Sequence, residues 1–248
     1  MGGTDIDAHG THVCGVIGAR PNASSAFAGL APGVDLFCIR VFPSGQGANQ
    51  GDIADAIDQL SRHNQVDLIN LSLGATTPSQ IEHDAILDAL DQGTLCICAA
   101  GNSAGPVEYP AAFRETVAVS ALGFEGWGPN GTLTATHYPE KRERYGNDRL
   151  YLANFSCFGQ EIECSALGVG IIAPVPERFG LVAPSGAMDG TSMASPAACG
   201  ALAARLAVTP DYQSLQRDLL RAEKAHTLLR EHSRDLGLAP YFQGRGIL

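Results

Sequence analysis

The sequence contains no apolar run approaching about 18 residues, so we expect no membrane-spanning helix. Positive charge is also scarce, because 16 Lys and Arg residues face 26 Asp and Glu residues and leave a net charge of -10. This balance argues against nucleic acid and anionic membrane surfaces as partners. Segment 20–27 has no carboxylates to give calcium its roughly six to eight oxygen ligands, so we assign neither a metal nor a cofactor.

The seven cysteines are an odd number and are scattered through apolar segments. Two of them lie two residues apart on one expected strand, which is not the spacing of a metal site. We therefore expect reduced, buried core residues. Because residues 1–10 also lack the pattern of a signal peptide, we expect a cytoplasmic location. The cysteines are Cys14, Cys38, Cys96, Cys98, Cys157, Cys164 and Cys199.

Short apolar runs alternate with segments of helical period, as in an α/β domain. This alternation implies a mostly parallel sheet with right-handed crossovers and helices on both faces. Mixed charges and spaced leucines in 211–234 predict a pair of surface helices covering the sheet. We expect strands at 34–42, 66–73, 94–100 and 117–122, and helices at 51–63 and 78–92.

The pattern breaks at about 123–153, which we interpret as an insertion. It carries the charged cluster 140–144, and charge runs usually mark solvated surface. A solvated loop is favoured, while contact with a partner or with a substrate cleft stays open.

Residues 190–196, Gly-Thr-Ser-Met-Ala-Ser-Pro, place Ser192 at the mouth of an expected helix. Gly190 allows close approach of the backbone to a ligand, and Pro196 suits a first helical turn. A serine hydroxyl is a weak nucleophile unless a base lies within hydrogen-bond reach. The motif therefore predicts a nucleophile only if the chain also supplies a histidine and a donor for an oxyanion.

His9 stands at the entrance of a small-residue helix and is the candidate base, whereas His12 lies deeper and is expected to be packed. Asn102 follows the apolar run 94–100, at the carboxyl end of an expected strand, where open α/β sheets bind ligands. We expect Asn70 to bond the backbone. A lone serine or histidine in such places is usually a cap or a structural residue, but the three together favour chemistry.

The order His9, Asn102, Ser192, with segments 66–74 and 242–246, resembles the subtilisin-like serine proteases, or subtilases. The resemblance implies the three-layer subtilisin-like α/β fold over residues 1–248, as one catalytic domain. It also implies a serine endopeptidase that hydrolyses peptide bonds through an acyl-enzyme. Ser192 would be the nucleophile, His9 the general base and Asn102 a donor to the oxyanion.

The resemblance further places the binding of a polypeptide substrate. Glu108 would stand at the floor of the primary pocket and favour Lys or Arg before the scissile bond, unless it turns to solvent. Gly45 and Gly47 would border an edge that pairs with extended peptide. The two pocket walls would be Ser72, Leu73 and Gly74 on one side, and Ala99, Ala100 and Gly101 on the other.

The family's triad aspartate stands on a strand well upstream of the histidine, and here only Asp5 and Asp7 precede His9. They lie too close to it and resemble the acidic residues often found just before the family's histidine. We therefore expect an N-terminally truncated domain whose carboxylate comes from a missing N-terminal segment or another chain. The alternative is an inactive pseudoprotease or a peptide-binding fragment.

Overall fold

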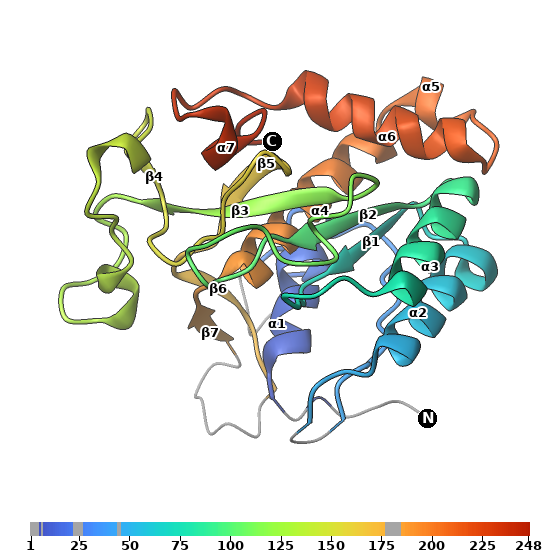
Figure 1. The fold of residues 1–248 in the computed structure, drawn as a ribbon, viewed down its shortest axis with the longest axis horizontal. Helices are drawn as coiled ribbons and strands as arrows, with labels where there is room; N and C mark the ends of the chain where they lie inside the picture. The colour runs from blue at the N-terminus through green and yellow to red at the C-terminus, as the bar shows by residue number, and fades with distance from the viewer. Residues whose placement is uncertain (1–4, 6, 22–26, 44–45, 177–184) are drawn as a thin grey trace.

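The computed structural model describes residues 5, 7–21, 27–43, 46–176 and 185–248. Its main sheet joins parallel strands β1, β2, β3 and β5, with β4 antiparallel on β3 (Figure 1). The expected strands at 66–73, 94–100 and 117–122 are confirmed. The strands are β1 (Leu68–Leu71), β2 (Leu95–Ala99), β3 (Val117–Phe124), β4 (Leu150–Leu152) and β5 (Ile162–Leu167), and a separate hairpin pairs β6 (Ile171–Pro174) with β7 (Ser185–Met188).

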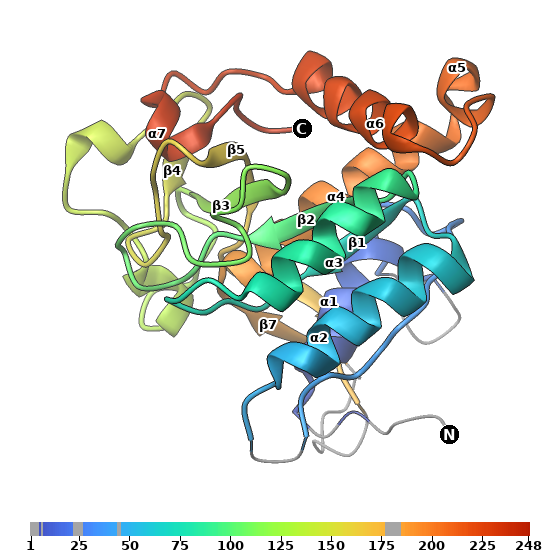
Figure 2. The same ribbon diagram turned by 45° about the vertical axis from the view of Figure 1, so that its right-hand side comes forward.

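Helices cover both faces of the sheet, as expected. Figure 2 shows α2 and α3 lying side by side, with α1 behind them. The expected helix at 51–63 starts as an α-helix and ends as a π-helix, Gln59–Asn64. The α-helices are α1 (His9–Gly18), α2 (Gln50–Asp58), α3 (Gln80–Asp91), α4 (Thr191–Ala207), α5 (Pro210–Gln213), α6 (Leu219–His232) and α7 (Pro240–Gln243), so the expected helix pair in 211–234 is present as α5 and α6.

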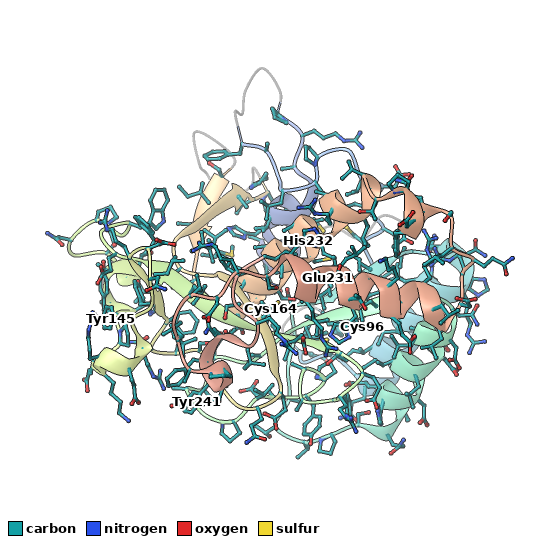
Figure 3. All side chains as sticks on the ribbon, turned by 90° about the horizontal axis from the view of Figure 1, so that it is seen from above. Cys96, Tyr145, Cys164, Glu231, His232 and Tyr241 are labelled. Atoms are coloured by element: carbon teal, nitrogen blue, oxygen red, sulfur yellow. The ribbon has the colours of Figure 1, made fainter. Side chains whose placement is uncertain are left out.

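Strand β2 shows why three layers form. Its residues are all buried, and alternate side chains enter different cores. Leu95 and Ile97 pack with side chains of α1, α4, α5 and α6, whereas Cys96 and Cys98 pack with those of α2 and α3. Figure 3 shows the labelled Cys96 and Cys164 in the interior of the molecule.

The expected strand at 34–42 is wrong: this segment has no regular secondary structure and pairs with no strand among the described residues. Leu36, Phe37 and Phe42 are exposed, at 40%, 48% and 41%. A strand needs a hydrogen-bonding neighbour as well as an apolar pattern. The segment instead lines a cavity of about 1980 Å³, which β1 and α1 also line.

The expected insertion is only partly a loop. Residues 123–124 end β3 and residues 150–152 form β4, so both ends of the segment belong to the sheet. Between them lie two 3₁₀ turns, Leu133–Thr136 and Arg142–Arg144. The charged run 140–143 is exposed, as expected, and the labelled Tyr145 lies at the periphery in Figure 3.

Candidate active site

Ser192 lies in the first turn of α4, which begins at Thr191. Pro196 therefore falls in the second turn, one turn later than expected. A proline has no N–H, so the carbonyl oxygen of Ser192 loses the donor that would lie four residues on. The hydroxyl of Ser72 donates to this oxygen at 2.8 Å, and Ser192 Oγ in turn lies 3.4 Å from the carbonyl oxygen of Ser72.

Hydrogen bonds between three side chains hold Ser72 in place. Asn70 Nδ2 donates to Ser72 Oγ at 2.9 Å, and Asn70 Oδ1 accepts from Ser195 Oγ at 2.7 Å. The expectation that Asn70 bonds the backbone is therefore wrong. Its amide instead links the end of β1 to α4, because β1 and α4 lie against each other and bring the three polar side chains together.

Asn102 is fastened to the start of α4. Its Oδ1 accepts from both the backbone N–H and the hydroxyl of Thr191, at 2.8 and 2.9 Å. Thr191 is fully buried, and its Oγ1 also accepts from the N–H of Gly101, at 3.1 Å. Because Oδ1 is taken, the amide hydrogens on Nδ2 are the free part of the side chain, and the described residues offer them no acceptor. Sequence reasoning did not assign Thr191 a role.

His9 begins α1 and is half-buried. Burial lowers its pKa below the ordinary 6.5, against the opposing charges of Asp5 and Asp7. His9 and Ser72 line the same cavity, and Ser72 is bonded to Ser192. His12 is fully buried, as expected, and its Nε2 lies 2.9 Å from the carbonyl oxygen of Ile171.

Neither aspartate before His9 acts as its partner. Asp5 Oδ2 accepts from the backbone N–H and the hydroxyl of Thr11, at 2.7 and 2.6 Å, and so caps α1. These bonds outweigh the effect of burial and lower the pKa of Asp5. Asp7 is exposed. Among the described residues, His9 forms no ion pair, and Asp5 and Asp7 influence it only through longer-range charge.

Glu108 lies between the two expected pocket walls. An added Cβ on Gly74 would lie 2.9 Å from Glu108 Oε2, and one on Gly101 would lie 2.5 Å from Glu108 Cδ. Only glycine leaves room for the carboxylate at these positions, and Gly101 also has a φ of +108°. Ser103 Oγ donates to Glu108 Oε1 at 3.0 Å, which fixes the carboxylate between the walls.

The remaining expected substrate residues differ in how far they are exposed to solvent. Gly47 is exposed, with open space where a Cβ would stand, whereas Gly45 is outside the described residues. Leu73 is half-buried, and both Ala99 and Ala100 are buried at the carboxyl end of β2.

The described residues contain no group of three or more potential metal ligands. Within the same residues, no helix is long and apolar enough to cross a bilayer.

Segment 123–153 contacts the turn before Ser192. Asp189 Oδ1 accepts from the N–H of Gly170 at 2.6 Å, and Thr134 donates to the same carboxylate at 3.3 Å. His137 Nε2 lies 3.5 Å from Asp189 Oδ2. Trp127 Nε1 donates to the carbonyl oxygen of Gly170 at 2.8 Å. Segment 123–153 thus supports one side of the turn that precedes Ser192.

Known proteases resemble this chain in both sequence and structure. The sequence profile of the subtilase family matches residues 2–243. The minor extracellular protease Epr of Bacillus subtilis (strain 168) is 32% identical over 237 residues, covering 95% of this chain and 31% of Epr. The major intracellular serine protease of the same organism is 31% identical over 252 residues, covering 99% of this chain and 68% of that protein. The structure of sphericase matches with a TM-score of 0.77 and 27% identity, covering 98% of this chain and 78% of sphericase.

The fold is that of the subtilisin-like serine proteases. The chain belongs to the subtilase family, since the family profile spans nearly all of it. The expected three-layer subtilisin-like α/β fold is confirmed. The chain spans less than a third of the length of Epr and about two thirds of the intracellular relative.

Proposed function

We propose that the chain hydrolyses peptide bonds as a serine endopeptidase. Ser192 Oγ attacks the carbonyl carbon while His9 takes its proton, and the amide of Asn102 donates to the oxyanion. His9 then passes the proton to the leaving amine, and water hydrolyses the acyl-enzyme. The observation that carries this proposal is the pair of bonds from Thr191 to Asn102 Oδ1, which fix the amide beside the nucleophile and leave its donors free.

We propose that the carboxylate partner of His9 enters on a polypeptide strand outside these 248 residues. Strand β1 pairs only with β2 among the described strands, so its other edge keeps unpaired backbone groups. The cavity of about 1980 Å³ borders β1, segment 34–42 and His9. A strand added there would pair with β1, cover the exposed Leu36 and Phe37, and bring a carboxylate toward the imidazole.

The test compares this chain with the gene product extended upstream of Met1. A fluorophosphonate reacts with an activated serine, and mass spectrometry identifies the labelled residue. We expect labelling at Ser192 that is faster by about 10⁴ in the extended protein, the order of the effect of a triad carboxylate. Ser192→Ala should abolish the labelling. Equal rates in the two proteins would show that no added carboxylate is needed.

The second candidate is a non-catalytic peptide-binding domain. The observation that favours it is the lack of an ion pair at His9 among the described residues. In that case Ser192 would stay unlabelled in both proteins, while an extended peptide would still bind and protect Leu73 and Gly74 from hydrogen exchange. Labelling at Ser192 in either protein excludes it.

We also propose that Glu108 selects substrates with Lys or Arg before the scissile bond. Its carboxylate lies between Gly74 and Gly101 and is held by Ser103. A partly desolvated carboxylate attracts a cationic side chain and penalises an acidic one.

For location, we propose the cytoplasm. Five cysteines are buried free thiols, which is typical of proteins kept under reducing conditions. The two relatives named above differ in location, since one is called extracellular and the other intracellular. Thiol alkylation of the protein isolated from cells measures how many of its cysteines are reduced, and so tests this location.

A further inference from the structure

Two of the seven cysteines differ from the rest. Cys96, Cys98, Cys157, Cys164 and Cys199 are buried, as expected, but Cys14 is only half-buried and Cys38 is exposed, so the expectation is wrong for this pair. Their sulfur atoms lie 2.8 Å apart, although 24 residues separate them in the chain. Both also line the cavity that borders His9. The two thiols are therefore close to each other and open to small molecules.

The two cysteines stand on different elements. Cys14 lies on α1, five residues after His9, and Cys38 lies in segment 34–42. The hydrogen bond from Cys14 lowers the pKa of Cys38 to about 7, against the opposing effect of burial. The same bond, followed by burial, raises the pKa of Cys14. Cys38 is thus the thiolate of the pair, and Cys14 is the thiol that donates to it.

We propose that Cys14 and Cys38 form a reversible disulfide, with a small-molecule disulfide such as oxidised glutathione as the oxidant. The Cys38 thiolate attacks one sulfur of glutathione disulfide, forms a mixed disulfide and releases one glutathione thiolate. Cys14 then loses its proton to solvent and attacks the Cys38 sulfur, which forms the Cys14–Cys38 bond and releases the second glutathione. Two protein thiols are oxidised, and one glutathione disulfide is reduced to two thiols.

The cross-link would join one wall of the cavity to the helix that carries His9. Segment 34–42 belongs to no strand, and most of its residues are exposed. A covalent bond to α1 would restrict this segment and close a loop between residues 14 and 38. Oxidation would therefore stabilise the fold on the side where the carboxylate strand is proposed to enter.

The experiment treats the full chain with oxidised glutathione and follows its intact mass. We expect the loss of two hydrogen masses in the native protein, reversed by dithiothreitol. Cleavage before Asp35 separates the two cysteines, so a disulfide-linked pair of peptides identifies the bond. The melting temperature should rise by a few degrees on oxidation and return on reduction.

Single variants separate the two roles. In Cys14→Ser, Cys38 should keep one glutathione, because no thiol resolves the mixed disulfide. In Cys38→Ser, glutathione should add to Cys14 more slowly, by about tenfold or more. The double variant should not change in mass. A persistent glutathione adduct on the native protein, or a cross-link involving another cysteine, would overturn the proposal, as would no reaction at all.

Discussion

The hydroxyl of Ser72 donates to the carbonyl oxygen of Ser192 at 2.8 Å, across 120 residues of sequence. The acceptor is free for this bond because Pro196 cannot supply the helical N–H. Ser72 thus ties the end of β1 to the first turn of α4. The position of Ser192 therefore depends on a side chain at the end of β1 as well as on its own helix.

Ser72→Ala should loosen this turn. We expect a loss of about 1 kcal/mol in the free energy of unfolding and slower fluorophosphonate labelling of Ser192. Ser79→Ala is a matched control, since Ser79 caps α3 through the N–H of Glu82 and should cost similar stability. Equal slowing of labelling in both variants would mean that Ser72 acts through stability alone.

Thr191→Val should remove the hydroxyl that serves Gly101 and Asn102. The N–H of Gly101 would be left buried without an acceptor, which costs about 1–3 kcal/mol in the free energy of unfolding. Denaturant unfolding measures this loss. Thr191→Ser keeps the hydroxyl and should retain most of the stability and the labelling rate. If serine and valine behave alike, the hydroxyl does not hold Asn102.

Glu108→Gln should weaken any preference for a basic residue before the scissile bond. With the active, extended protein, kcat/KM is measured for peptides that differ only in Arg, Lys, Phe or Leu at that position. Arg and Lys should lose their advantage in the variant, while Phe and Leu change little. Glu115→Gln is the control, because that carboxylate pairs with His83. Cleavage after Leu as fast as after Arg in the native protein contradicts the proposal.

The acidic limb of activity should report on His9, which accepts a proton only when neutral. Burial lowers its pKa below 6.5, so the labelling rate should fall only at a pH below that value. An added carboxylate stabilises the imidazolium and raises the pKa. The limb should therefore move to higher pH in the upstream-extended protein, and an unmoved limb would argue against a carboxylate beside His9.

Stability in acid should depend on Glu163. Arg230 Nε donates to Glu163 Oε1 at 2.6 Å, and His226 Nε2 lies 3.6 Å from Oε2. Burial raises the pKa of Glu163, but the bonds and charges of His226 and Arg230 outweigh it and lower the pKa from 4.5 to about 2. This contribution is complete above pH 4.5 and is lost as the pH falls toward 2, on the order of 3 kcal/mol at most.

Glu163→Gln should therefore flatten the dependence of unfolding free energy on pH between 4.5 and 2. The exposed Glu161, two residues away, provides the matched control as Glu161→Gln. Urea unfolding at several pH values measures both variants. The assignment fails if the two substitutions change the slope equally.

The local sequence pattern was enough to predict many of the helices and strands of this protein. The apolar run of β2, the helix that presents Ser192 and the small-residue helix after His9 could all be predicted, because each depends on residues close together in the chain. The order of His9, Asn102 and Ser192 was enough to indicate the family, which the family profile supports.

Contacts between distant residues required the tertiary structure. Segment 34–42 has the pattern of a strand, but whether it pairs depends on a neighbour that its own residues do not encode. Asn70 bonds Ser72 and Ser195 because α4 crosses the end of β1. Cys14 and Cys38 look like core residues in sequence, and only packing places their sulfurs together at the rim of a cavity. Sequence sets which groups are present, and packing decides which of them meet.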